Sequence, residues 1–264
     1  MSRATQPAGR GLSDPPLPTG ADKTALVRSM FDTIAPRYDL VNRVMTFGLD
    51  VRWRRRACRS LGLPAGSTVL DVACGTGDFL RELAHQGMAP VGVDLSWGML
   101  AANTSGEPLV QADAARLPVA TGSVAGVTCG YALRNVTDLE AVLAELARVL
   151  KPSGRLSLLE VSEPTWAPLR LGHRLWFTRA VPVIGALLSD AEAYRYLPRS
   201  VAYLPDEDRL RTLLVQAGFS GVNRRALLGG ASQLVTATRS ASAAATGSAP
   251  GTPSSGASPM PPEP

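Results

Sequence analysis

The sequence contains few cysteines and no long uninterrupted run of apolar residues. Its three cysteines, Cys58, Cys74 and Cys129, lack the spacing of metal ligands, so we expect reduced thiols and neither a disulfide framework nor a metal site. No uncharged apolar run approaches the roughly 20 residues that cross a bilayer. The N-terminal residues also lack the apolar centre of a signal peptide. These absences predict a cytoplasmic protein.

Apolar periodicity is missing from both ends of the chain, which are rich in Pro, Gly, Ser and Ala. Such compositions cannot bury enough apolar surface to become ordered, so residues 1–21 and 240–264 are predicted to be disordered tails. The 264 residues are 45% hydrophobic and 19% charged, which suffices for one sizeable core. Residues 22–239 are therefore expected to form a single domain.

Short apolar runs alternate with helical periods from Ser67 onward, which is typical of an α/β fold with a mostly parallel sheet. The residues GGAS separate the last two apolar runs, so the sheet is expected to close with an antiparallel hairpin. The residues KPSG at 151–154 should turn the chain from a helix into the fifth strand. The expected strands are residues 68–73, 90–94, 109–112, 126–130, 155–161, 222–227 and 233–238.

Two segments lie outside this alternation. An amphipathic helix ended by Pro36, followed by more helical residues, precedes the sheet and predicts an N-terminal helical cover. A long segment rich in apolar and aromatic residues follows the fifth strand. In open α/β folds, such additions usually build the substrate pocket above the carboxyl ends of the strands.

A glycine-rich turn follows the first expected strand, in the residues VLDVACGTGDF from Val69 to Phe79. Gly75 and Gly77 allow the backbone to approach a ligand at a helix N-terminus. A dinucleotide fingerprint needs a third glycine, and Leu80 stands in its place. The turn therefore argues against NAD.

Acidic residues accompany successive strands. Asp71 lies inside the first expected strand, Asp94 ends the second and Asp113 follows the third. A carboxylate at Asp94 can accept hydrogen bonds from both ribose hydroxyls, and Asp113 is placed to meet an adenine. Each carboxylate alone could instead cap a helix or a turn, but their placement after successive strands favours a nucleoside site.

The pattern D-x-x-x-G-x-G, the acidic end of the second strand and the residues DA…LP resemble the class I methyltransferases, which bind S-adenosylmethionine. This resemblance implies a Rossmann-like fold. Gly130 stands where a serine that touches the cofactor is usual. The implied cofactor-binding residues are Asp71, Gly75, Thr76, Gly77, Asp94, Leu95, Asp113, Ala114 and Gly130.

Longer motifs narrow the resemblance. The residues FDTIAPRYDLVN, LRNVTD and AYRYLPRSV resemble signatures of the menaquinone/ubiquinone C-methyltransferase family, and the likeness extends from about Met30 to Gly230. It implies methyl transfer from S-adenosylmethionine to a ring carbon of a polyprenylated quinol, foremost demethylmenaquinol. Two alternatives stay open: a methyltransferase for another phenolic or polyketide-like acceptor, and a catalytically silent S-adenosylmethionine-binding subunit of a quinone-synthesis complex.

Ring-carbon methylation requires removal of a quinol proton and alignment of two reactants. The resemblance implies that Arg134 and Asn135, after the fourth strand, do this together with Tyr38 and Asp39 of the helical cover. Arg134 stays protonated, so it would stabilise a quinolate oxygen or position a water. The structural alternatives are a buried ion pair of Arg134, with an acid such as Asp138, and a core position for Tyr38.

The residues RWRRRACR concentrate positive charge on one expected helix of a chain whose formal net charge is +5. They form either a solvated face or a patch for an anionic membrane, where each basic residue adds about 1 kcal/mol. The second interpretation would place the protein at the inner face of the cell membrane. No nucleic-acid partner is expected, and self-association to a homo-oligomer stays open. The arginines are Arg52, Arg54, Arg55, Arg56 and Arg59.

Overall fold

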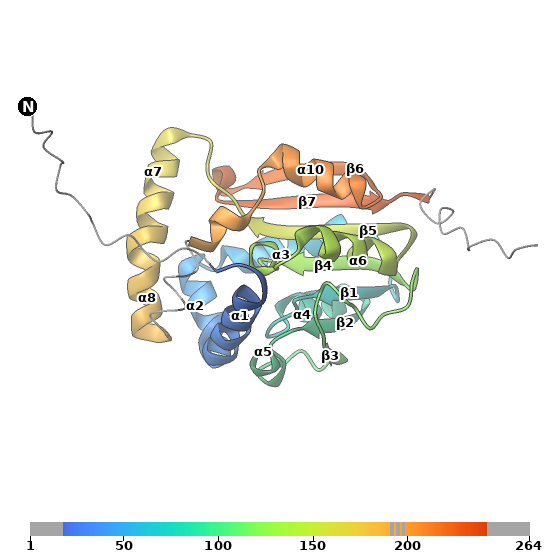
Figure 1. The fold of residues 1–264 in the computed structure, drawn as a ribbon, viewed down its shortest axis with the longest axis horizontal. Helices are drawn as coiled ribbons and strands as arrows, with labels where there is room; N and C mark the ends of the chain where they lie inside the picture. Colours follow the sequence, from blue (N-terminus) through green and yellow to red (C-terminus); the bar gives the residue numbers. More distant parts are fainter. Residues whose placement is uncertain (1–17, 191–192, 194–195, 197–198, 242–264) are drawn as a thin grey trace, which may run out of the picture.

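The computed structural model describes residues 18–190, 193, 196 and 199–241. Its strands form one sheet in the order β3-β2-β1-β4-β5-β7-β6. Strands β1 to β5 are parallel, and β7 runs antiparallel to both β5 and β6 (Figure 1). The strands are β1 (Thr68–Val72), β2 (Ala89–Asp94), β3 (Leu109–Gln111), β4 (Val124–Gly130), β5 (Leu150–Val161), β6 (Phe219–Leu227) and β7 (Ser232–Arg239). The predicted α/β fold with an antiparallel end hairpin is confirmed.

Helices surround this sheet and are connected by short 3₁₀ segments. The α-helices are α1 (Gly20–Ile34), α2 (Tyr38–Met45), α3 (Leu49–Ser60), α4 (Asp78–His85), α5 (Trp97–Ala101), α6 (Leu139–Val149), α7 (Ala167–Leu175), α8 (Val181–Leu188) and α10 (Glu207–Gln216). The π-helical segment η3 (Trp176–Ala180) joins α7 to α8. The 3₁₀ segments are η1 (Ala35–Arg37), η2 (Leu133–Asn135), η4 (Val201–Tyr203) and η5 (Leu228–Gly230).

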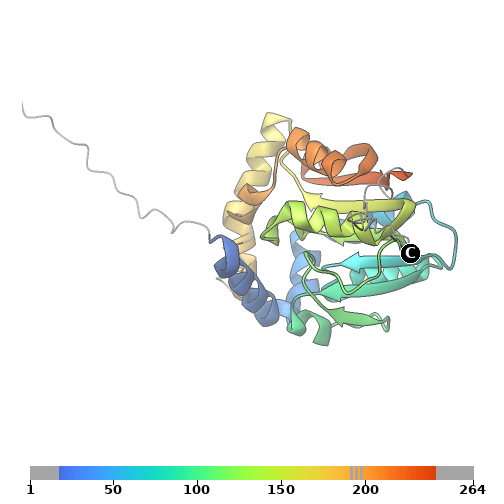
Figure 2. The same cartoon turned by 45° about the vertical axis from the view of Figure 1, so that its right-hand side comes forward.

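The core lies on both faces of the sheet, because strand side chains alternate between them. Leu70 and Val72 of β1 pack with the apolar side of α6 and α10, whereas Val69 packs with α3 and α4. In α6, apolar residues recur at three- and four-residue spacing, which gives that helix one buried side. The sheet is therefore covered by helices on both faces (Figure 2).

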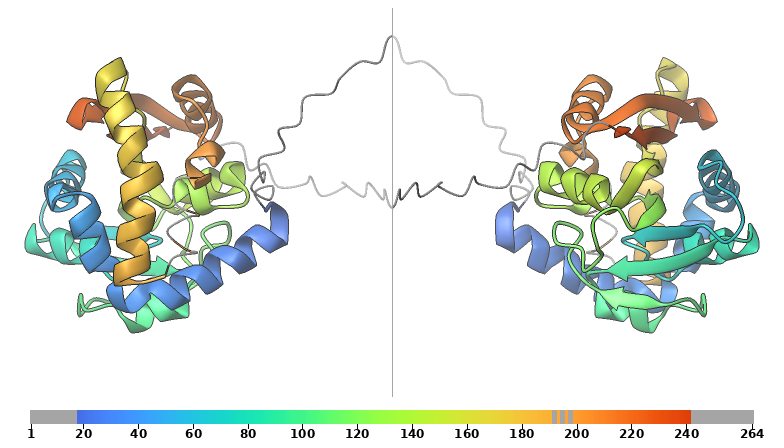
Figure 3. Two further views of the ribbon diagram at one scale, coloured as in Figure 1. Left: turned by 90° about the vertical axis from the view of Figure 1, so that its left-hand side faces the viewer. Right: turned by 90° about the vertical axis from the view of Figure 1, so that its right-hand side faces the viewer.

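The remaining helices stand at the edge where the parallel strands end. Helices α1, α2 and α8 share a separate apolar cluster, which includes Val27, Ile34, Val41 and Val181. Figure 3 shows α7 and α8 as the outermost layer on this side of the molecule. The order of the strands reverses between β1 and β4, and ligands of open α/β sheets bind outside such a reversal. The helical cover therefore encloses the edge where a ligand is expected.

The strand boundaries differ from the sequence-based expectation, most of all at the starts of β5 and β6, which lie five and three residues earlier than expected. Strand β5 begins at Leu150 rather than Arg155, because Leu150 already pairs with Val124. The next pair joins Arg155 to Gly126, so residues 151–154 bulge from the ladder instead of ending the helix in a separate turn. Helix α1 begins at Gly20, two residues before the expected start of the domain. Most of both expected tails lies outside the described residues.

Candidate functional site

A cavity of about 380 Å³ lies at the carboxyl ends of β1, β2 and β4, beneath α1. Its volume falls within the roughly 300–1,000 Å³ that is usual for ligand pockets. The glycine turn after β1 and the ends of β2 and β4 form one side, and residues of α1 and α2 form the other. Of the residues predicted from the sequence, the cavity is lined by Tyr38, Gly75, Thr76, Asp94, Leu95, Asp113, Ala114, Gly130 and Asn135.

The turn between β1 and α4 depends on two glycines with positive φ. Gly75 has φ 53° and Gly77 has φ 91°, a region that strains residues with a Cβ. The carbonyl oxygen of Gly75 accepts a hydrogen bond from Asn103 Nδ2 at 2.9 Å. A Cβ at Gly77 would lie 2.5 Å from Asn103 Oδ1. The glycines thus let α4 begin directly at the cavity, although Gly77 itself does not line it.

Asp94 places its carboxylate at the end of β2. Its Oδ2 accepts a hydrogen bond from Gly75 N at 2.8 Å, and its Oδ1 accepts one from Ser96 N at 2.8 Å. Burial raises the pKa of Asp94 above the usual range. A carboxylate has about four acceptor positions, so each oxygen of Asp94 retains capacity for a hydroxyl in the cavity.

Asp113 and Asp71 occupy different positions relative to the cavity. Asp113 lines it, and its Oδ1 also accepts a hydrogen bond from Ala115 N at 2.9 Å, which fixes the turn after β3. Asp71 lies beneath the glycine turn and does not line the cavity. Its Oδ1 accepts a hydrogen bond from Thr128 Oγ1 at 2.7 Å, and burial raises its pKa to about 8. Its Oδ2 has no hydrogen-bond partner among the residues that the structure describes.

The loop after β4 is held by Glu160 of β5. Glu160 Oε1 lies 2.6 Å from Arg134 Nη1, and its Oε2 accepts a hydrogen bond from Leu133 N at 3.0 Å. The ion-pair alternative for Arg134 is thus present in the structure, but with Glu160 instead of Asp138. Asp138 instead caps α6 by accepting a hydrogen bond from Ala141 N at 2.9 Å.

Two buried polar atoms of this loop are unpaired. Arg134 Nε and Asn135 Oδ1 have no hydrogen-bond partner among the residues that the structure describes. Asn135 lines the cavity, whereas the neighbouring Arg134 does not line it and pairs with Glu160. Unpaired buried polar atoms are costly in a folded protein. Their position beside a cavity indicates that a ligand or water completes their hydrogen bonds.

Tyr38 and Asp39 are the first two residues of α2, and their side chains contact different parts of the site. Tyr38 lines the cavity, and its ring packs edge-on against Phe31 with centroids 6.0 Å apart. Burial raises the pKa of the Tyr38 hydroxyl. Asp39 does not line the cavity; its carboxylate accepts a hydrogen bond from the hydroxyl of Thr76 and lies 3.5 Å from Arg81 Nη2. Asp39 therefore contacts the glycine turn directly.

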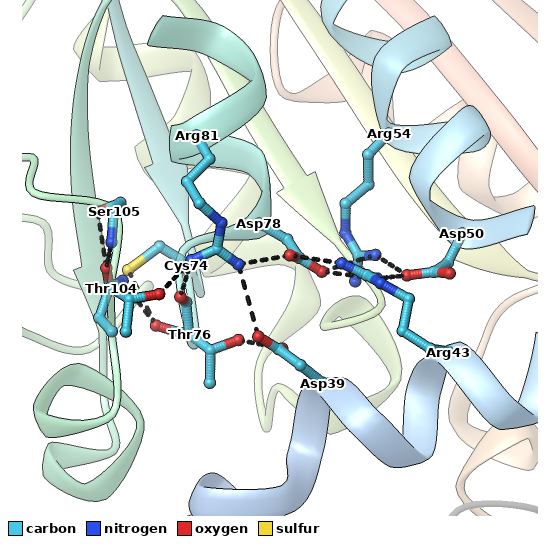
Figure 4. A network of polar contacts seen from close by, with 12 residues as sticks. Asp39, Arg43, Asp50, Arg54, Cys74, Thr76, Asp78, Arg81, Thr104 and Ser105 are labelled. Atoms are coloured by element: carbon cyan, nitrogen blue, oxygen red, sulfur yellow. Dashed lines mark hydrogen bonds and ion pairs between the residues drawn. The ribbon is translucent and has the colours of Figure 1, made fainter. Parts of the chain in front are cut away.

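A network of three arginines and three carboxylates connects the helical cover to α4 (Figure 4). Its centre is Asp78, the first residue of α4. Asp78 Oδ1 lies 2.9 Å from Arg43 Nη2 and 2.5 Å from Arg81 Nη2, and its Oδ2 lies 3.0 Å from Arg54 Nη1. Burial alone would raise the pKa of Asp78, but Arg54 and Arg43 outweigh it and hold that pKa below its usual range. We call Asp39, Arg43, Asp50, Arg54, Asp78 and Arg81 the arginine network.

Arg54 is the member of this network that reaches the cavity. Its side chain is 8% exposed, pairs with Asp50 and Asp78, and lines the cavity. The guanidinium lies 5.7 Å from the ring centroid of Tyr131 and 6.0 Å from that of Phe79. Sequence reasoning missed this position. The spacing of Asp50 and Arg54, one helical turn apart, was the local signal that could have suggested it.

The arginine-rich helix is thus only partly the surface that the sequence suggested. In α3, Arg52, Arg55, Arg56 and Arg59 are exposed, and Arg55 lies 3.5 Å from Glu82. The prediction that Arg54 belongs to this basic patch is wrong, because Arg54 is buried and its side chain pairs with Asp78 of α4. The four exposed arginines recur at three- and four-residue spacing and share one side of α3.

The packing around position 130 explains why this residue is a glycine. A Cβ added to Gly130 would lie 2.4 Å from Cε2 of the Phe79 ring. Phe79 is 4% exposed and packs in the core between α3 and α4. The ring therefore fills the space that a side chain at position 130 would need.

Comparison with known proteins gives consistent matches. A model of the ubiE/COQ5 methyltransferase family matches residues 19–239. Ubiquinone/menaquinone biosynthesis C-methyltransferase UbiE of Syntrophotalea carbinolica is 42% identical over 223 residues, which cover 81% of this chain and 94% of that protein. Demethylmenaquinone methyltransferase of Beutenbergia cavernae is 42% identical over 208 residues, which cover 77% of this chain and 87% of that protein.

Solved structures share the fold at lower identity. A SAM-dependent methyltransferase of Thermotoga maritima has a TM-score of 0.59 at 20% identity and covers 81% of this chain and 99% of its own. Phosphoethanolamine N-methyltransferase 2 of Haemonchus contortus, in complex with S-adenosyl-L-methionine, has a TM-score of 0.54 at 14% identity and covers 72% of this chain and 52% of its own. The family model and the curated relatives together show that this chain belongs to the ubiE/COQ5 methyltransferase family.

Proposed function

We propose that this protein transfers a methyl group from S-adenosylmethionine to a ring carbon of a polyprenylated quinol, with demethylmenaquinol as the preferred acceptor. The observation that carries this proposal is a single cavity that joins the strand-end carboxylate of Asp94 to Tyr38 and Asn135. The two curated relatives bear the names of quinone-pathway methyltransferases and match most of this chain. Their names support the same class of acceptor.

The residues at the strand ends fit S-adenosylmethionine. Asp94 has acceptor capacity on both oxygens, which suits a ribose diol. Asp113 and Ala114 line the adjoining wall and would contact the adenine. The backbone of the glycine turn would hold the amino-acid part of the cofactor at the N-terminus of α4. When bound, S-adenosylmethionine supplies an electrophilic methyl group on a positively charged sulfur.

The apolar wall of the cavity would orient the quinol ring and exclude bulk water. Val27 and Phe31 of α1, together with Val142 of α6, supply this wall. Tyr38 would contact the ring from the cover side. A carbon nucleophile and a methyl donor react fastest when they are held in line, so the principal task of these side chains is alignment.

Arg134 and Asn135 would assist removal of the quinol proton. The ring carbon becomes a strong nucleophile as a quinol hydroxyl loses a proton to a water, and the ring becomes aromatic again when that carbon loses its own hydrogen as a proton after methyl transfer. Asn135 Oδ1 would accept a hydrogen bond from that water, and Arg134 Nε, which lies outside the cavity lining, would act through a water on the oxygen where negative charge develops. Glu160 would keep the guanidinium in this position through its ion pair with Arg134.

Asp39 would act as a positioning residue. It accepts a hydrogen bond from Thr76, which lines the cavity, and lies beside Arg81 of α4. Through this contact, α2 would fix the glycine turn and at the same time present Tyr38 to the cavity. The role of Asp39 would then be to connect the two halves of the site.

The test is incubation of the pure protein with labelled S-adenosylmethionine and a panel of demethylated naphthoquinols, benzoquinols and simple phenols. We expect label on the ring carbon of demethylmenaquinol and none on simple phenols. Label on phenols alone would show that the acceptor is a phenol and not a quinol. Binding of S-adenosylhomocysteine by calorimetry, without transfer to any acceptor, would contradict the catalytic proposal and indicate a silent subunit.

A further inference from the structure

The outward side of α7 and α8 carries apolar residues where a surface helix normally carries polar ones. Leu171 and Leu175 of α7 are 61% and 47% exposed, and Val183 and Leu187 of α8 are 58% and 77% exposed. These residues recur at helical spacing. The inward residues Trp176, Val181 and Ile184 belong instead to the apolar cluster that α8 shares with α1 and α2. We call Leu171, Leu175, Val183 and Leu187 the cover face.

The cover face lies among basic residues. Arg170, Arg174 and Arg179 are exposed, and the sequence from Pro164 to Ser189 contains no Asp or Glu. No ion pair to these three arginines occurs within the part of the chain that the structure describes. Two copies of this surface in contact would bring like charges together. The charge instead complements an anionic surface.

Trp166, at the N-cap of α7, is 67% exposed. An exposed tryptophan beside exposed leucines and arginines is typical of helices that lie in the headgroup region of a bilayer. None of the helices in the described ranges is both long and apolar enough to cross a membrane. The amphipathic pattern therefore suits a helix that lies on a membrane.

The cover face is one helix layer away from the cavity. Helix α2 packs beside α8, where Arg37 Nη1 donates a hydrogen bond to Leu188 O at 2.9 Å and the rings of Phe47 and Trp176 lie 4.9 Å apart. Tyr38, at the start of α2, packs on the same cluster as Val181 and also lines the cavity. Figure 3 shows α7 and α8 outermost on this side.

We propose that the cover face docks on an anionic lipid bilayer and places the cavity next to the membrane. Each basic residue near such a surface strengthens binding, and each leucine that enters the interface adds apolar burial. The inference deepens the proposed function, because a polyprenylated quinol resides in lipid. It assigns membrane contact to α7 and α8, whereas the sequence had pointed to the arginines of α3.

The test is co-sedimentation of the full chain with vesicles of phosphatidylcholine and phosphatidylglycerol, compared with vesicles of phosphatidylcholine alone. We expect binding that requires the anionic lipid and weakens with salt. The variant Leu171→Gln, Leu175→Gln, Leu187→Gln should bind at least about tenfold more weakly, because three leucines no longer enter the interface. The variant Arg170→Gln, Arg174→Gln, Arg179→Gln should lose the preference for anionic lipid.

The matched control is Arg52→Gln, Arg56→Gln, Arg59→Gln, which removes three exposed charges from α3 and should change binding less than about threefold. Loss of binding in this control, with binding retained in the leucine variant, would overturn the proposal. Wild-type protein that does not bind the vesicles would also overturn it. So would a wild-type protein that is dimeric in solution while the leucine variant is monomeric. Methylation of a tail-free naphthoquinol in the absence of lipid tests the proposed function separately, and we expect the leucine variant to retain it.

Discussion

The two sides of the cavity are held in position by different interactions. On the strand side, Gly75 and Ser96 donate backbone hydrogen bonds to Asp94, and Ala115 donates one to Asp113. On the cover side, Arg54 reaches the cavity only because Asp50 and Asp78 hold its guanidinium. The carboxylates of the strand side are thus held by backbone N–H groups of the loops that follow the strands. The cover side depends on charges from three helices.

This difference predicts different responses to perturbation. Backbone hydrogen bonds at strand ends persist as long as the sheet is folded. A buried charge network, in contrast, becomes destabilising when one member is made neutral, because the remaining charges stay desolvated without their partner. Substitutions on the cover side should therefore cost more stability, and substitutions on the strand side should mainly weaken ligand binding.

The largest effect is expected for Asp78→Asn. The change leaves Arg43, Arg54 and Arg81 without their shared carboxylate, and removal of one partner from a buried ion pair typically costs about 3–5 kcal/mol. The free energy of unfolding, measured by urea denaturation at neutral pH, should fall by an amount in this range. Because the pKa of Asp78 is lowered in the folded state, its contribution is present above a pH of about 4 and is lost below it.

The control for this prediction is Asp206→Asn. Asp206 is exposed and caps α10 by accepting a hydrogen bond from Arg209 N at 2.8 Å, and asparagine caps a helix about as well as aspartate. Its unfolding free energy should match the wild type. An Asp78→Asn protein as stable as this control would show that the arginine network does not hold the cover side in place.

The next largest effect is expected for Arg134→Lys, which keeps the charge but loses the planar guanidinium. Turnover of demethylmenaquinol should fall about a hundredfold, because the guanidinium proposed to stabilise the developing oxygen anion is replaced by a group of different shape. S-adenosylmethionine affinity should change less than about twofold, since the effect belongs to the transition state. Single-turnover kinetics and calorimetry measure the two quantities separately.

The matched control is Arg148→Lys. Arg148 also pairs with a glutamate, with its Nε 2.6 Å from Glu145 Oε1, but neither residue lines the cavity. This variant should keep its turnover even if its melting temperature falls. If Arg134→Lys shows a lower melting temperature with unchanged turnover of the folded fraction, its ion pair with Glu160 is only structural.

A smaller effect is expected for Asp94→Ala on the strand side. Loss of charge-assisted hydrogen bonds to the ribose should weaken S-adenosylmethionine binding by about 1–3 kcal/mol. The unliganded protein should lose less stability than Asp78→Asn does, because the N–H groups of Gly75 and Ser96 border a cavity that water can enter. Calorimetry with S-adenosylhomocysteine measures the first quantity, with NAD as the ligand expected not to bind. Unchanged affinity in Asp94→Ala would remove this carboxylate from the cofactor site.

The strand side could be predicted from the sequence because its signals are local. A buried strand, a glycine turn and an acidic strand end are each recognisable within a few residues, and their order along the chain follows the order of the sheet. The predicted positions of Asp94, Asp113 and the glycine turn therefore agree with the lining of the cavity. The start of β5 was misplaced, since the pair between Val124 and Leu150 is long-range and KPSG resembles an ordinary turn.

The cover side could be predicted only in part. The motif that contains Tyr38 and Asp39 pointed to α2, but nothing local shows that Asp39 meets Thr76 or that Asp78 meets Arg43 and Arg54. Those pairs join residues about 24 to 37 positions apart, and their geometry follows from helix packing. Arg54 was assigned to the surface for the same reason, because a charge run on a helix usually marks a solvated face.

The smallest effect concerns Gly130, which ends β4 on the strand side of the cavity. A Cβ at this position would lie 2.4 Å from the Phe79 ring, which packs beside Arg54 of the arginine network. Gly130→Ser should therefore cost about 1–2 kcal/mol of unfolding free energy, because a rigid ring in a packed core must shift. In a Phe79→Leu background, the same change should cost less than half as much, since leucine can turn away from the added atom. Urea denaturation of both single variants and the double variant measures this coupling. Equal costs of Gly130→Ser in the two backgrounds would show that Phe79 does not fix the glycine, and the absence of a serine there would need another cause.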